Sequence, residues 1–336
     1  MKASNITKAR SIYKTGKNSA FPNGEMNTLQ KLSLTAMPNY KLDPLYNTYR
    51  YAFTFLSSKA NFDDEPMSEF ADSIVNDLFQ EGKLNEALTA SVVMNVFMEI
   101  SHNLYNVVRS CGDGENDLRS LDKAAAYYIG KGQEEGENGS GYMMYHIAEN
   151  GGYWFDQDEG ETMVNTAIIN HFHYLKNDVL TKNLCSATNE DLRLTTYESV
   201  RRAVNNIISK MTIPLIQNLI YNMDTTGNRY MVELYAIALI PQFVACSSDD
   251  YQTLLQKFIM TKYTDKTKSE FDGIVQILQR NYECLGIKCA DVGAYKTDVV
   301  PICVDGFMGD YAGFKPATNF TKVGCSMIFI QFLTYL

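Results

Sequence analysis

Candidate metal ligands gather in one stretch of the chain, residues 121–177, which contains three of the four histidines and the only tryptophan. Carboxylates, phenols and imidazoles recur there at helical spacing: Tyr145 and Glu149 are four residues apart, and His146 and Glu149 are three apart. Oxygen-rich groups bind hard cations, and ferric iron also accepts phenolate and imidazole ligands. We therefore predict a metal site drawn from six residues, namely Asp122, Tyr128, Tyr145, His146, Glu149 and His171.

The same residues have a purely structural interpretation, because buried tyrosines and histidines in helical bundles commonly do no more than satisfy hydrogen bonds. A third interpretation, a hydrolytic enzyme with His146 or His171 as its base, has the least support. The sequence contains no G-x-S-x-G, no P-loop, no H-x-E zinc motif and no G-x-G-x-x-G after a strand.

Three short helices joined by glycine-containing loops are expected to position these side chains. Apolar spacing predicts helices over residues 121–129, 142–149 and 161–177, with Asp117 or Ser120 as the N-cap of the first. We expect Gly151 and Gly152 to end the second helix. The acidic loops at 130–141 and 150–160 are expected to approach the junction. An anion could bind where residues 139–141 open the second helix, although a flexible turn is the alternative there.

Several segments of this stretch follow a recognisable order. Leu-Asp-Lys-Ala runs into Tyr-Tyr-Ile-Gly at 121–130, a Gly/Ser-rich loop precedes Tyr-x-x-Ala-Glu at 145–149, and an aromatic cluster at 153–155 precedes Val-Asn-x-x-Ile at 164–168. This order resembles the algal iron-assimilation proteins, which are secreted periplasmic proteins of green algae and diatoms induced by iron limitation or high carbon dioxide. Residues 284–293 also resemble the close of the family's second half.

The resemblance implies an extracellular or cell-surface iron-binding protein that assists iron assimilation and is not an enzyme. It implies ferric rather than ferrous iron, held with a synergistic anion, and either a membrane-bound uptake partner or self-association. The implied location is secreted, periplasmic or at the cell surface. The alternative is a structural or adhesive cell-surface scaffold without a metal site.

Composition limits the partners of the chain. The formal net charge is −9 and no cluster of Lys and Arg is present, so nucleic acid is not an expected partner. The apolar run at 327–336 is too short to cross a bilayer, and we expect no transmembrane segment. Residues 1–17 are basic and polar, without the apolar core of a signal peptide. We expect them to be either a flexible arm or the start of a processed chain.

The seven cysteines include one close pair, Cys284 and Cys289. We predict a disulfide between these two if the protein is secreted, because they lie where a helix is expected to end. The other cysteines are expected to be buried free thiols. No second pair of cysteines has the spacing of a zinc site.

The helical periodicity predicts an all-α fold, a bundle-like array built from two tandem four-helix repeats. The expected parts are an irregular N-terminal arm at 1–60, a first repeat at 61–190 carrying the candidate site, a second repeat at 191–293, and a C-terminal tail at 294–336 packed on the bundle. In the second repeat, a Thr195–Glu198 capping box should start a helix over 197–221 that Pro214 kinks.

Overall fold

The chain is all-α, as predicted, in a computed structural model. The structure describes residues 2–17, 20, 23–34, 43–46, 48–49, 68–131, 133, 141–155, 162–225, 228–260, 263–264, 267–295 and 303. Within these ranges no β-strand forms, and Ala20 and Met26 make one isolated bridge. The acidic loop segments 134–140 and 156–161, and nearly all of the tail predicted at 294–336, lie outside the described residues.

The irregular N-terminal arm was a wrong prediction. Helix α1 (Lys2–Thr15) and helix α2 (Leu29–Leu34) occupy much of it. Few residues of α1 pack against the core. Ile6 and Ala9 are only partly buried, whereas Tyr13 is buried and donates a hydrogen bond to Asp72 at 2.9 Å. Packing against the neighbouring helix, rather than a strong apolar periodicity, makes this segment helical.

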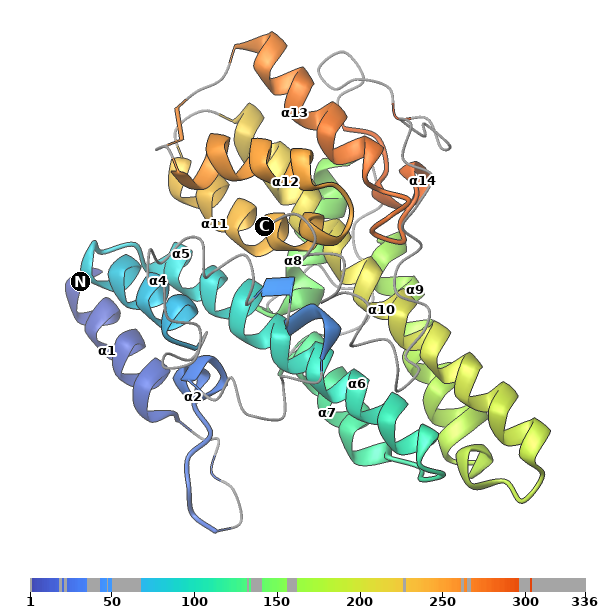
Figure 1. Cartoon of the computed structure of the whole chain (residues 1–336). Helices are drawn as coiled ribbons and strands as arrows, with labels where there is room; N and C mark the ends of the chain where they lie inside the picture. The colour runs from blue at the N-terminus through green and yellow to red at the C-terminus, as the bar shows by residue number, and fades with distance from the viewer. Residues whose placement is uncertain are drawn as a thin grey trace, which may run out of the picture.

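The next helices form one long helical segment and a helix that runs antiparallel to its end (Figure 1). The long segment is nearly continuous through α5, η2 and α6, and α7 runs back alongside α6. Asp117 is the N-cap of α7, one of the two predicted, and accepts a hydrogen bond from the Ser120 N–H. The bounds are α4 (Ser68–Gln80), α5 (Leu84–Ala90), η2 (Ser91–Val96), α6 (Phe97–Gly112) and α7 (Leu118–Ile129).

Helix α8 (Met144–Trp154) runs through Gly151 and Gly152, which were expected to end it. Both glycines are buried, and Gly151 lies against helix α10 (Glu190–Asp224). A Cβ atom at Gly151 would come within 2.6 Å of Gln217 Oε1, so the glycine allows two helices to approach closely instead of stopping one of them. Helix α9 (Met163–His173) and η3 (Tyr174–Leu180) follow α8.

Helix α10 begins earlier than predicted and passes through Pro214 without ending. Asn189 is its N-cap and accepts from the Leu192 N–H at 2.9 Å. The predicted capping box at Thr195 is therefore wrong, since Thr195 lies inside the helix and its hydroxyl donates to the Asp191 carbonyl at 2.9 Å. A strong cap and acidic residues in the first turn favour the earlier start.

The remaining helices form a group around the C-terminal end of α10 (Figure 1). Ser247 caps α12 and Thr267 caps α13 with a full capping box. The bounds are α11 (Arg229–Leu239), η5 (Ile240–Ala245), α12 (Ser248–Leu255), η6 (Gln256–Met260), α13 (Lys268–Arg280) and α14 (Cys289–Val292). Since α10 packs against α6, α8, α9 and α11, it joins both groups of helices, and the two-repeat arrangement stays a prediction.

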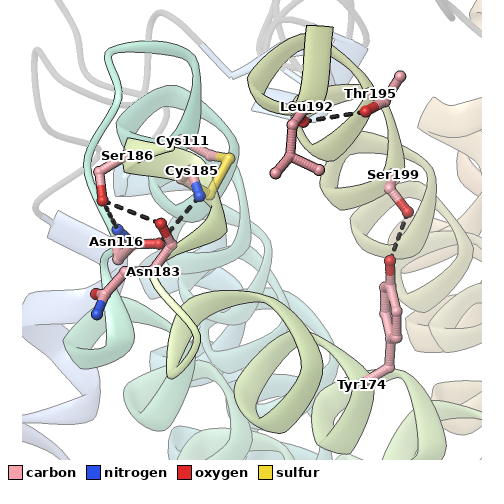
Figure 2. Close-up of a disulfide and its surroundings, with 9 residues drawn as sticks. All are labelled: Cys111, Asn116, Tyr174, Asn183, Cys185, Ser186, Leu192, Thr195 and Ser199. Atoms are coloured by element: carbon pink, nitrogen blue, oxygen red, sulfur yellow. Dashed lines mark hydrogen bonds between the residues drawn. A yellow bond between two sulfur atoms is a disulfide. The ribbon is translucent and has the colours of Figure 1, made fainter. Parts of the chain in front are cut away.

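Three disulfides tie the helices together. Cys111 at the end of α6 bonds to Cys185 in η4 (Leu184–Ser186), where Asn116 and Asn183 also contact Ser186 (Figure 2). The other two pairs are Cys246–Cys284 and Cys289–Cys303.

The predicted Cys284–Cys289 pair is therefore wrong. The chain reverses between these two residues, where Gly286 adopts a φ of +76°. Cys284 lies beside Cys246, which directly follows η5, and bonds to it. Cys289 is the first residue of α14 and bonds to Cys303. Their closeness in sequence therefore does not bring their sulfurs together.

Two glycines inside helices offer a matched test of the close approach between α8 and α10. We expect Gly273→Ala to raise the free energy of unfolding by about 0.5–1 kcal/mol, because a Cβ there has nothing within 4 Å and alanine is the better helix former. We expect Gly151→Ala to lower it by about 1–3 kcal/mol, because Gln217 and Asn218 are buried and hydrogen-bonded. Urea unfolding of both variants measures this, and equal stabilisation would contradict the close contact.

Candidate functional site

Three of the six predicted site residues meet in one buried polar cluster between α7, α8 and α9. The Tyr128 hydroxyl donates to Asn165 Oδ1 at 2.5 Å. Asn165 Nδ2 donates to the Tyr145 carbonyl at 3.0 Å and also to Glu149 Oε1, and Thr162 Oγ1 donates to the same Glu149 oxygen at 3.0 Å. All five residues are buried. The cluster is thus a closed set of donors and acceptors from three helices.

Two members of this cluster, Thr162 and Asn165, were not predicted as site residues. Thr162 is the N-cap of α9 and accepts from the Asn165 N–H, so its position follows from helix capping. The sequence gives less indication of Asn165 as a site residue. It is a polar residue next to Val164, and both are buried on α9. Its amide connects both neighbouring helices because it offers donors and an acceptor at once.

Burial, together with nearby charge, favours the protonated form of the Tyr128 phenol. Burial raises the pKa of the Tyr128 phenol well above its usual value, and the charge of Glu149 and the phenol of Tyr145 raise it further. The rings of Tyr128 and Tyr145 contact edge to face, 6.3 Å apart. A ferric ion bound here would have to displace the Tyr128 proton and the hydrogen-bond donors that contact Glu149.

His146 lies on the outer side of α8, next to this cluster but not in its hydrogen bonds. Its Nε2 atom is 3.0 Å from Asn150 Nδ2, and its ring is 6.4 Å from that of Tyr142. Its Nδ1 atom is buried and has no hydrogen-bond partner among the described residues. Burial lowers the pKa of His146, while the charge of Glu149 acts in the opposite direction.

Asp122 and His171 lie apart from the cluster. Asp122 is exposed on α7 and forms an ion pair with Lys176 at 2.8 Å. His171 is half-buried on α9, where burial and, to a lesser extent, the charge of Lys210 lower its pKa. The structure therefore brings together Tyr128, Tyr145 and Glu149, with His146 beside them, and leaves the other two predicted ligands elsewhere.

Across the described ranges, no group of three or more His, Cys, Asp and Glu side chains is arranged to hold a metal ion. No helix in those ranges is long and apolar enough to span a bilayer. No family model, curated protein or solved structure matches this chain.

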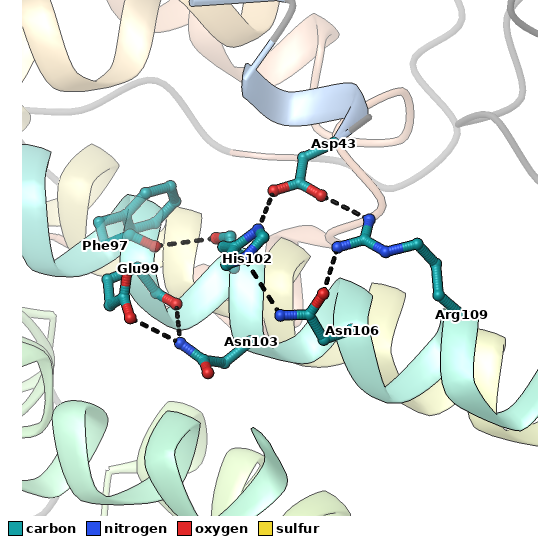
Figure 3. Close-up of polar contacts among 8 residues, drawn as sticks. Asp43, Phe97, Glu99, His102, Asn103, Asn106 and Arg109 are labelled. Atoms are coloured by element: carbon teal, nitrogen blue, oxygen red, sulfur yellow. Dashed lines mark hydrogen bonds and ion pairs between the residues drawn. The ribbon is translucent and has the colours of Figure 1, made fainter. Parts of the chain in front are cut away.

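A second polar network fastens the segment that contains Asp43 to helix α6 (Figure 3). Asp43 accepts from Arg109 Nη1 and contacts His102 Nδ1, both at 2.7 Å. Arg109 also donates to Asn106 Oδ1, which leaves Asn106 Nδ2 to donate to His102 Nε2 at 3.1 Å. The bonds close into a ring only if the neutral imidazole carries its proton on Nδ1. This ring satisfies the buried Asp43 carboxylate and has a structural role.

The two histidines with lowered pKa predict a pH dependence of stability. In the unfolded chain each histidine has a pKa of about 6.5, which is above its pKa in the folded protein. As the pH falls, the unfolded state therefore binds more protons than the folded state. The contribution of these histidines to the free energy of unfolding is fully present above about pH 6.5 and decreases as the pH falls below that value. We expect urea unfolding to show decreasing stability between about pH 7 and about pH 5.

Substitution separates these histidines from the other titrating groups. We expect His146→Gln and His171→Gln each to weaken this pH dependence, because each removes one group that must protonate on unfolding. His173→Gln is the matched control, since His173 is exposed on the same helix as His171. An unchanged slope in both test variants would contradict the assignment.

Proposed function

We propose that this protein is a non-enzymatic structural or adhesive scaffold that works outside the cytosol, in a secreted, periplasmic or cell-surface location. The observation that carries the proposal is the cysteine pairing: six of the seven cysteines form three disulfides. Structural disulfides persist in oxidising compartments and are rare where glutathione keeps thiols reduced.

The positions of the disulfides suit a scaffold. Cys111–Cys185 joins the far end of the α6–α7 pair to the segment that leads into α10, and Cys246–Cys284 joins the turn before α12 to the turn after α13. Each bond closes a loop between elements that are distant in sequence, which limits the freedom of the unfolded chain. The buried carboxylates of Asp43 and Glu149 accept hydrogen bonds from their neighbours, as expected for groups that stabilise a fixed body.

Thiol counting on protein from its native source tests this proposal. We expect at most one reactive thiol after denaturation without reductant and seven after reduction, because the paired cysteines do not react. Peptide mapping should recover Cys111 linked to Cys185, and Cys246 linked to Cys284. Seven free thiols in the unreduced native protein would overturn both the disulfides and the oxidising location.

Iron binding is the second candidate function, as the resemblance to the algal iron-assimilation proteins implies. The observation that favours it is the convergence of two phenols and a carboxylate, Tyr128, Tyr145 and Glu149, from two helices. Ferric iron accepts these ligand types, and a membrane-bound uptake protein would then receive the ion. The raised pKa of Tyr128 opposes phenolate formation, so binding would have to release the phenolic proton to solvent.

Titration of the purified protein with ferric citrate, followed by the visible phenolate-to-iron band, tests the second candidate. We expect Tyr145→Phe combined with Glu149→Ala to weaken binding at least about tenfold, roughly 1.4 kcal/mol, with an unchanged helical circular dichroism spectrum. Tyr235→Phe combined with Glu115→Ala is the matched control, because Tyr235 is a buried phenol on α11. No phenolate band in the unaltered protein would exclude an iron site at these residues.

A further inference from the structure

One face of helix α8, together with Tyr142 just before the helix, presents rings and uncharged polar groups that are not buried. Along this face a tyrosine, a histidine, an asparagine, a tyrosine and the only tryptophan follow one another at helical spacing, and a tyrosine from α10 adjoins the last of them. We call this set the aromatic strip, and its members are Tyr142, His146, Asn150, Tyr153, Trp154 and Tyr221.

The rings of the strip are accessible. Tyr142 is 74% exposed, Tyr153 is 54% exposed and Trp154 is 37% exposed. The buried residues of α8 include Tyr145, Ala148 and Glu149. Glu149 is the only Asp, Glu, Lys or Arg residue between Met144 and Trp154, and it is buried, so this helix offers no carboxylate, ammonium or guanidinium group to the solvent.

The rings at the end of the strip hold one another in place. The Trp154 indole stacks on Tyr221 with ring centroids 4.1 Å apart and an interplanar angle of 14°. Tyr153 meets the same indole edge to face at 4.9 Å and 77°. Tyr221 covers one face of the indole, and Trp154 remains 37% exposed. Rings that are already fixed lose little conformational freedom on binding.

Polar groups occupy the middle of the strip. Asn150 and His146 are one helical turn apart and hydrogen-bonded, with 3.0 Å between Nδ2 and Nε2, so the imidazole and the amide are held as a pair. The amide oxygen of Asn150 can accept a further hydrogen bond, and it lies between the rings of Tyr142 and Tyr153 in the sequence.

Exposed aromatic rings beside neutral polar groups are chemically complementary to sugars. A pyranose ring presents polarised C–H groups on its flat faces and hydroxyl groups around its edge. The faces of tyrosine and tryptophan rings carry negative charge density and attract such C–H groups, while neutral amides and imidazoles bond to hydroxyls without favouring an ion. With eleven residues at about 1.5 Å per residue, α8 is about 16 Å long, which suits an extended chain rather than a single sugar.

We propose that the aromatic strip binds a neutral linear polysaccharide, with its sugar faces stacked on Tyr142, Tyr153 and Trp154 and its hydroxyls bonded near Asn150. The proposal rests on the function proposed above and deepens it, because it names the surface component that such a scaffold would hold. Acidic polymers do not suit the strip, since the chain carries a net charge of −9 and the strip offers no cation.

Trp154 reports directly on this surface, because it is the only tryptophan of the chain. The experiment titrates the whole protein with cello-, xylo-, manno-, laminari- and chito-oligosaccharides and follows tryptophan emission. We expect a saturable change with at least one of these neutral sugars. Fragments of heparin and of polygalacturonate serve as charged comparisons, and we expect them to bind more weakly than that sugar.

Two pairs of substitutions complete the test. Tyr142→Ala with Tyr153→Ala removes two exposed rings, keeps the tryptophan, and should weaken binding at least about tenfold, because each stacked ring contributes to affinity. Leu192→Ala with Leu194→Ala removes apolar side chains that are 44% and 60% exposed at the start of α10, and should leave binding unchanged. Circular dichroism checks that both variants are folded.

Three results would overturn the proposal: no response to any of the neutral sugars, equal affinity in the tyrosine variant, or tighter binding of the charged fragments. Failure here is distinguishable from failure of the proposed function. Intact disulfides with no sugar binding would leave the scaffold standing without this ligand. Sugar binding by a protein whose native cysteines are all free would support the aromatic strip as a binding surface and contradict the proposed oxidising location.

Discussion

The middle of helix α10 has no exposed side, and the rest of the structure depends on covering it. Every residue from Met211 to Ile220 is buried, so neighbours must pack around the helix in all directions. A helix that is buried on every side requires other elements packed around it. Helices α6, α8, α9 and α11 supply that cover, which explains why groups from both halves of the chain meet on this one helix.

Covering α10 also requires partners for the polar groups buried with it. Gln217 donates to the Val292 carbonyl at 2.7 Å, Asn218 donates to the Pro214 carbonyl at 2.8 Å, and Thr212 donates to Gln242 at 2.9 Å. These bonds are costly to break in a dry interior, so they specify which elements lie where. The Asn165 cluster and the Asp43 ring act in the same way at the edges of the body.

Disulfides and buried polar networks fix the interior, whereas part of the surface presents exposed rings. Helix α8 shows this division most clearly, because Tyr145 and Glu149 face the interior whereas Tyr153 and Trp154 face outward. The inward groups already have hydrogen-bond partners, and the outward rings are accessible. A ligand would therefore meet preformed rings without any rearrangement of the core, and this is why we place the binding surface there.

Local sequence determined the helical class, limited the N-cap of α7 to two residues, one of which is Asp117, and located the region in which Tyr128, Tyr145 and Glu149 meet, because apolar spacing and capping act over a few residues. Only the tertiary structure decided that α1 is a helix, that Gly151 lies between two helices, and that Cys284 bonds to Cys246 rather than to Cys289. Each of these depends on a neighbour distant in the sequence, and a disulfide forms only where folding brings two Cβ atoms together. The separation of Asp122 and His171 from the other four predicted ligands has the same cause, since the packing of α7 and α9 sets the directions in which their side chains point.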